Sequence, residues 1–172
     1  MKKNIIIGLV ICFIVSIITG LIIVKNKRDY KELISTAGIK NIEEINYEIP
    51  KFSILTSGMY TDPITQEDIK DLKKYKFKAV IDNGVEKEVH TYVGVKVNDV
   101  LQKLKYKDFS HLTFMSSGHL QVMYNADELT DNVFWAFEVD GKKYPQAEEI
   151  TLINPDVKAR YNLTCIVKLV FD

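Results

Sequence analysis

The sequence has few of the residues that form covalent cross-links or metal sites. Its 172 residues include two cysteines, Cys12 in an N-terminal apolar run and Cys165 in an apolar run near the C-terminus. We therefore expect no intrachain disulfide, so the fold must be stable without covalent cross-links. The three histidines, His90, His111 and His119, show neither H-x-x-x-H nor H-x-H spacing. Their pattern indicates ordinary surface or strand-end histidines rather than a zinc site.

Motifs for nucleophilic catalysis are also missing. No serine lies in a G-x-S-x-G frame, and the segments Ser57-Gly58 and Ser116-Ser117-Gly118 are typical of turns. The adjacent carboxylates Glu43-Glu44 and Glu148-Glu149 are typical of solvated loops. The triplet Asn162-Leu163-Thr164 matches a glycosylation acceptor, but it adjoins a predicted strand and such triplets occur by chance. Repeats and low-complexity tracts are absent from the sequence.

An excess of basic charge is missing from most of the chain. The chain is formally neutral, but five basic residues and no acidic ones lie within the first 28 residues. The following 144 residues carry 18 basic and 23 acidic side chains, a net charge of −5. A domain with a negative net charge lacks the excess of basic side chains that binds phosphate groups, so we expect no nucleic-acid partner. Its length suits one domain with a substantial core.

One long hydrophobic run is present, from Ile5 to Val24, and it contains no charged residue. As a helix it would match the roughly 30 Å hydrocarbon core of a bilayer, so we interpret residues 1–28 as a membrane anchor with basic flanks. A cleaved signal peptide is the alternative, but no A-x-A-like site precedes Lys25. Lipidation of Cys12 is disfavoured because Ile11 before it is not small. Basic residues on both sides leave the orientation open.

Residues 29–50 are predicted as a spacer, with a short charged helix from Asp29 to Lys40. Strands are expected from the alternation of apolar residues, and helices from Thr65 to Tyr75 and from Asn125 to Leu129, each opened by a capping pattern. The predicted strands are 52–56, 77–81, 85–92, 111–115, 120–124, 132–139, 150–153 and 164–171. Strands dominate, so the predicted class is α+β, with a mixed, largely antiparallel sheet system and short helices.

The segment from Thr91 to Leu104, TYVGVKVNDVLQKL, is central to the prediction. A strand ends at Gly94, and apolar residues at helical spacing then predict a short amphipathic helix. Asn98 and Asp99 are expected to cap the start of that helix.

Three motifs resemble, in order, those of the sulfite-oxidase-like, molybdopterin-binding oxidoreductase domain family. They are the aromatic-Gly strand and helix in TYVGVKVNDVLQKL, the strand and short helix in SSGHLQVMYNADEL, and the hairpin FWAFEVDGKKY. Their order and spacing agree over residues 51–172. The resemblance implies a sulfite-oxidase-like fold for residues 51–172. It also implies an extracytoplasmic location, because small members with an N-terminal hydrophobic segment usually work outside the cytoplasm.

The same resemblance identifies what this chain has lost. Family members hold molybdenum through a cysteine after the strand that corresponds to residues 77–81, whereas this chain reads Val80-Ile81-Asp82-Asn83-Gly84 there. Molybdenum needs a soft thiolate, so we expect no metal and no catalytic residue, although retained molybdopterin is possible in principle. The relict pocket would be bounded by residues at the former cofactor mouth and one phosphate-binding cation: His90, Tyr92, Ser117, His119 and Arg160.

Three functions follow from this interpretation. The leading one is a membrane-anchored extracytoplasmic module that binds a small molecule or a protein. The second is a molybdopterin-dependent oxidoreductase with a metal ligand other than cysteine. The third is a structural cell-surface domain with a filled interior in place of a pocket.

Overall fold

The computed structural model describes residues 42–82, 87–144, 150–155 and 162–172. The chain divides into two compact units, Met1–Gly38 and Ile39–Asp172, and every described residue belongs to the second. The predicted membrane anchor and the charged spacer helix lie outside the described residues. Within those residues, no helix is long and apolar enough to cross a membrane.

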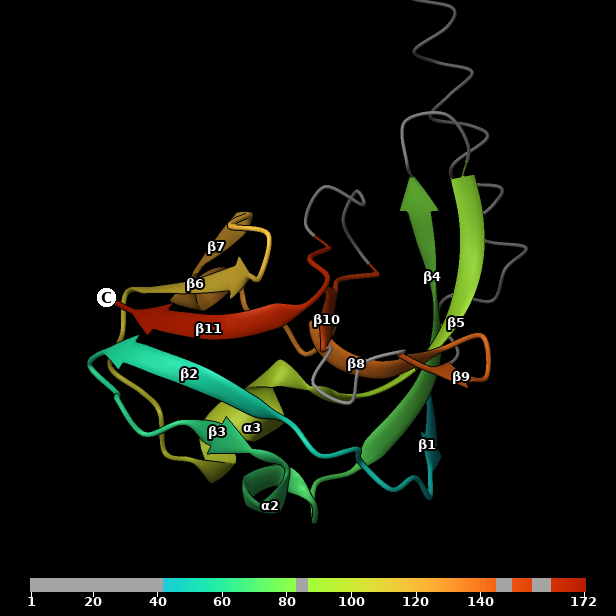
Figure 1. Ribbon diagram of the computed structural model, residues 1–172, viewed down its shortest axis with the longest axis horizontal. Helices are drawn as coiled ribbons and strands as arrows, with labels where there is room; N and C mark the ends of the chain where they lie inside the picture. The colour runs from blue at the N-terminus through green and yellow to red at the C-terminus, as the bar shows by residue number, and fades with distance from the viewer. Residues whose placement is uncertain (1–41, 83–86, 145–149, 156–161) are drawn as a thin grey trace, which may run out of the picture. The chain divides into compact units, whose positions relative to one another are not determined.

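The domain consists of two sheets (Figure 1). The first contains β1 (Glu43–Ile45), β4 (Lys74–Asp82), β5 (Lys87–Lys96), β8 (Phe134–Val139) and β10 (Thr151–Ile153) in that order, with β9 (Lys142–Lys143) paired to β8. The second contains β3 (Ile64–Thr65), β2 (Ser53–Gly58), β11 (Ile166–Phe171), β6 (His111–Ser116) and β7 (Gln121–Asn125). Among these pairs β2–β11 is parallel and the others are antiparallel. A mixed, largely antiparallel α+β architecture is confirmed.

The helices are shorter than the sequence predicts. The element α2 (Gln66–Ile69) begins with the expected capping box, in which the Thr65 backbone N–H and hydroxyl both donate to Asp68 Oδ2, at 2.7 and 2.6 Å. The predicted helix from Thr65 to Tyr75 is wrong in length, because α2 ends at Ile69 and β4 begins at Lys74. From Lys74 on, lysines alternate with apolar residues, and this period of two suits a strand. The predicted turn from Asn125 to Leu129 is the 3₁₀ helix η1 (Ala126–Glu128).

The junction between β5 and α3 (Val97–Lys103) differs from the prediction in two ways. Gly94 does not end the strand, because β5 continues to Lys96. A bulge lies between Val93 and Gly94, and a Cβ added to Gly94 would lie 2.1 Å from the carbonyl oxygen of Trp135 on β8. The glycine therefore allows close backbone approach inside the sheet. Asn98 does not cap α3 either; its side-chain nitrogen donates to the Leu129 carbonyl at 2.8 Å.

Strand β8 of the six-stranded sheet is buried on both faces over Phe134–Phe137. Trp135 and Phe134 are neighbours on β8 and point to opposite faces, yet both are fully buried. Trp135 belongs to the main core between the two sheets, together with residues of α3, β6 and β11. Phe134 belongs to a smaller cluster on the other face, where its ring stacks on Phe77 with centroids 4.1 Å apart. Neither ring lines a groove, so the aromatic residues of β8 serve the core.

The folded region also begins before Lys51. Strand β1 pairs with β4 in antiparallel register, and Ile49 is 3% exposed within the main core.

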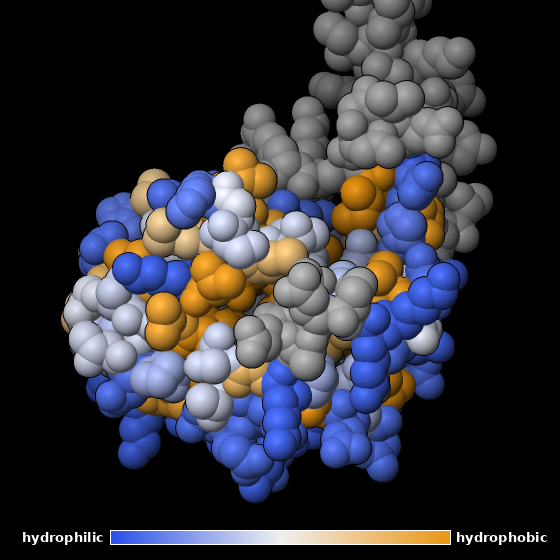
Figure 2. Space-filling model, viewed as in Figure 1, coloured by the Kyte–Doolittle hydropathy of each residue, from blue (hydrophilic) through white to orange (hydrophobic). Residues whose placement is uncertain are grey.

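The outer face of the five-stranded sheet exposes apolar side chains, including Leu55 and Val167. Figure 2 shows hydrophobic atoms gathered over β2 and β11 on this face.

Candidate ligand-binding cavity

A cavity of about 330 Å³ lies beside the smaller aromatic cluster of the six-stranded sheet. Strands β4, β5, β8 and β10 are neighbours in that sheet (Figure 1). Each of these strands contributes at least one side chain to the cavity wall. His90 and Tyr92 share one face of β5 because side chains two residues apart in a strand point the same way. The lining residues are Ile81, His90, Tyr92, Val139, Tyr144, Thr151, Ile153, Asn162 and Thr164. Its size lies at the lower end of the range for small-molecule sites.

His90 is held by two carboxylates. Its Nδ1 lies 2.6 Å from Oδ2 of Asp140, and its Nε2 lies 3.1 Å from Oε2 of Glu88. Asp140 occupies the first position of the predicted Asp-Gly hairpin, where Asp140 has φ +50° and Gly141 has φ +77°. Two successive positive φ values are typical of the tight turn that this dipeptide favours. The turn thus brings a carboxylate from the β8–β9 hairpin to a histidine on β5.

The same carboxylate binds the backbone of β5. The Thr91 N–H donates to Asp140 Oδ1 at 2.9 Å, and the Asp140 N–H donates to the Thr91 carbonyl at 2.7 Å. The Thr91 hydrogen bond and the bond to His90 hold the pKa of Asp140 below its usual value. The bond to Asp140 raises the pKa of His90, with a smaller contribution from Glu88. Burial raises the pKa of Tyr92, so its phenol stays neutral at physiological pH.

Two buried polar atoms in the cavity wall have no hydrogen-bond partner among the described residues. They are Thr151 Oγ1 and Asn162 Nδ2. Thr151 is 3% exposed. The amide oxygen of Asn162 accepts a hydrogen bond from the Asn154 N–H at 3.0 Å, which fixes its side-chain nitrogen as the unsatisfied group. Because that nitrogen is buried, the glycosylation triplet at Asn162 is not accessible in this folded state. Unsatisfied buried polar groups are costly, and a ligand is one way to satisfy them.

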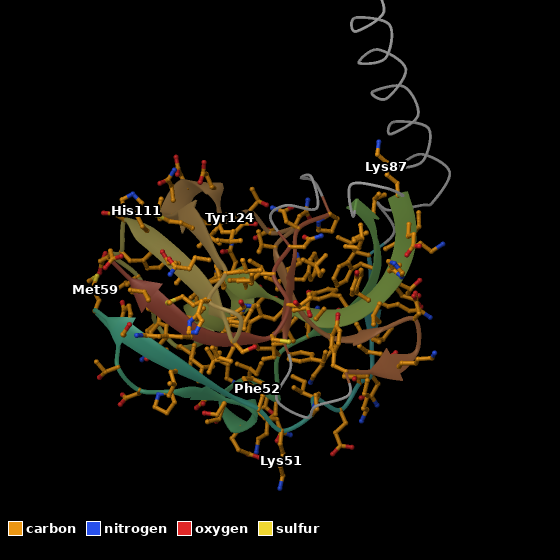
Figure 3. The ribbon with its side chains drawn as sticks, turned by 45° about the horizontal axis from the view of Figure 1, so that its top comes forward. Lys51, Phe52, Met59, Lys87, His111 and Tyr124 are labelled. Atoms are coloured by element: carbon orange, nitrogen blue, oxygen red, sulfur yellow. The ribbon has the colours of Figure 1, made fainter. Side chains whose placement is uncertain are left out.

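The structure brings together two of the five predicted pocket residues. His90 and Tyr92 line the cavity, whereas Ser117 and His119 lie in the turn between β6 and β7 of the other sheet. Figure 3 shows His111 and Tyr124 on that sheet, on the opposite side of the view from Lys87 on β5. Arg160 lies outside the described residues. Thr151, Asn162 and Tyr144 were not predicted to line a pocket. Thr151 belongs to no motif, and the motifs that contain Asn162 and Tyr144, a glycosylation triplet and a hairpin, do not indicate a cavity. The Asp-Gly turn was the available signal for Asp140.

The described lining does not suit molybdopterin and molybdenum. It offers no thiolate for the metal, and His90, its only side chain that can become cationic near neutral pH, already faces two carboxylates. Across the part of the chain that the structure describes, no group of three or more His, Cys, Asp or Glu side chains could hold a metal ion.

Searches with protein-family models and among curated proteins find no match to this chain. Among solved structures, the chain is similar to the sulfane dehydrogenase SoxCD from Paracoccus pantotrophus, with a TM-score of 0.57 and 16% sequence identity. The similarity covers 74% of this chain and 40% of the SoxCD chain. At that identity the likeness shows the fold alone. The domain thus has a fold distantly similar to that of an oxidoreductase.

Proposed function

We propose that this chain is a membrane-anchored, extracytoplasmic module of sulfite-oxidase-like fold that binds a small molecule without molybdenum. The observation that carries the proposal is the cavity with its two unsatisfied polar atoms, Thr151 Oγ1 and Asn162 Nδ2. A structural domain with a filled interior would leave no cavity of about 330 Å³ around these atoms. The apolar wall with a few convergent polar groups is typical of a ligand site.

The sulfite-oxidase-like fold is supported by the likeness to SoxCD and by the three ordered sequence motifs. Loss of metal chemistry is supported by the absence of cysteine from the 80–84 segment and from the described cavity wall. Membrane attachment rests on the uncharged run from Ile5 to Val24. The extracytoplasmic location rests on the family resemblance.

Ligand binding is tested with three probes of one shape and different charge: benzamide, benzoate and benzamidinium. The full chain, embedded in lipid nanodiscs, is titrated with each probe by saturation-transfer NMR. We expect at least one probe to bind with a Kd near 1 mM. That affinity is about 4 kcal/mol, a modest value for a fragment of this size.

A bulky substitution in the cavity wall tests whether the probes bind at this site. Thr164 lines the cavity and is exposed, so Thr164→Trp adds bulk there without filling the core. Thr61 is exposed in a loop and does not line the cavity, so Thr61→Trp is the matched control. We expect Thr164→Trp to abolish probe binding and Thr61→Trp to preserve it. No binding of any probe to the folded wild-type chain, or equal binding by both variants, would contradict the proposal.

A further inference from the structure

We propose that the cavity selects an uncharged small molecule in which a carbonyl or amide group is attached to a flat apolar body. This inference rests on the proposed function, because it names the ligand class of the same cavity. It follows from three properties of the wall: its unsatisfied hydrogen-bonding atoms, its histidine already paired with two carboxylates, and its apolar surface.

The hydrogen-bonding atoms define the polar end of the ligand. Asn162 Nδ2 can only donate, so it requires an acceptor such as a carbonyl oxygen. Thr151 Oγ1 can both donate and accept, so it can bind the same carbonyl or an adjacent N–H group. An amide provides both kinds of partner on one small planar group. Water can satisfy these atoms as well, but it leaves the apolar part of the wall uncovered.

The charges in and around the cavity disfavour an ionised ligand. His90 is the side chain of the described lining that can become cationic near neutral pH, and both of its ring nitrogens face carboxylates, Asp140 at 2.6 Å and Glu88 at 3.1 Å. An anionic ligand would therefore meet no free cation there and would lie near two carboxylates. A cationic ligand would compete with His90 for carboxylates that are about half exposed to water. Among the described lining residues, neither an anionic nor a cationic ligand group gains a partner of its own that would offset its desolvation.

The remaining wall accommodates an apolar body. Ile81, Val139 and Ile153 present aliphatic surface, and Tyr92 and Tyr144 present aromatic rings. Aromatic side chains contact flat rings favourably in stacked or edge-to-face arrangements. A ring that carries an amide matches the combination of this surface with the two unsatisfied polar atoms.

The three probes distinguish the ligand class from the existence of the site. In nanodiscs containing the full chain, we expect benzamide to bind at least about five-fold more tightly than benzoate or benzamidinium. If benzoate or benzamidinium binds equally well or better, the ligand class is wrong and the cavity remains a binding site. If none of the three binds, the proposed function itself fails.

Two substitutions test the polar contacts. Thr151→Val keeps the shape of the side chain and removes the hydroxyl, whereas Thr151→Ser keeps the hydroxyl. We expect Thr151→Val to weaken benzamide binding about five-fold and Thr151→Ser to retain it. Toluene, which lacks the amide, is the control probe, and its binding should be unchanged in Thr151→Val. Equal losses for toluene and benzamide would indicate a general change in the cavity and would overturn the assigned hydrogen bond.

Discussion

A single methyl group added at Gly94 should strongly lower the stability of the domain. A Cβ on this residue would lie 2.1 Å from the Trp135 carbonyl oxygen, 2.8 Å from its carbonyl carbon and 2.9 Å from Cα of Ala136. All three are backbone atoms, so no side-chain rotation can relieve the contact. Strands β5 and β8 would have to separate, although Trp135 and Ala136 are fully buried.

We expect Gly94→Ala to cost about 3 kcal/mol or more of unfolding free energy, at or above the usual range for overpacking. That is a large fraction of the roughly 5–15 kcal/mol that stabilises a typical domain. The corresponding decrease in Tm is roughly 10 °C. Thermal and urea unfolding of the full chain, followed by circular dichroism, measure both quantities.

Gly118→Ala is the matched control. The nearest atom to a Cβ at Gly118 is Ser116 Oγ at 3.7 Å, an ordinary van der Waals contact. Alanine also reduces the conformational entropy of the unfolded chain, so we expect a neutral or slightly stabilising effect. If the two alanine variants have the same stability, the close approach of β5 and β8 at Gly94 is wrong.

Three further predictions concern the cavity and the anchor. Asp140→Asn keeps an oxygen for the Thr91 N–H and removes the charge, so the pKa of His90, followed by NMR, should fall toward its ordinary value of about 6.5. Because the pKa of His90 is raised in the folded state, the stabilisation from its bond to Asp140 is complete below about pH 6.5 and is lost as the pH rises through the raised pKa. Asp140→Asn should therefore make the free energy of unfolding less dependent on pH in this range. An unchanged pH profile of stability would refute the coupling between His90 and Asp140. Thr151→Val removes an unsatisfied buried hydroxyl and should raise Tm by a few degrees, whereas a marked decrease would show that the hydroxyl has a partner. An alkaline phosphatase fused after Asp172 should be active in a bacterial host, and an inactive but intact fusion would place the domain in the cytoplasm.

Local signals in the sequence predicted much of the fold. Short-range motifs were predicted correctly because their residues lie within three positions of one another in the sequence. They are the capping boxes at Thr65 and Asn125 and the Asp140-Gly141 turn. Short strands such as β1 and β3 were not predicted, because two or three residues carry no periodicity. Their extended conformation depends on pairing with β4 and β2.

The cavity could be predicted only in part. His90 and Tyr92 were predicted because Tyr92 belongs to the aromatic-Gly motif of β5 and His90 lies two residues before it on the same strand. Thr151 was not predicted because it lies in an apolar segment that indicates an ordinary buried strand. Asn162 was not predicted because it is distant from β5 in the sequence. These residues meet only because β10 pairs with β8, which in turn pairs with β5. Long-range pairing of this kind leaves no short motif.

The most direct test of the central claim is the molybdenum and pterin content of the full chain, purified from a host that makes molybdenum cofactor. Elemental analysis measures the metal, and fluorescence of the oxidised pterin measures the organic part. We predict a folded protein with neither component above background. Near-stoichiometric molybdenum with pterin would contradict the account, and would favour an oxidoreductase in which another group replaces the missing cysteine.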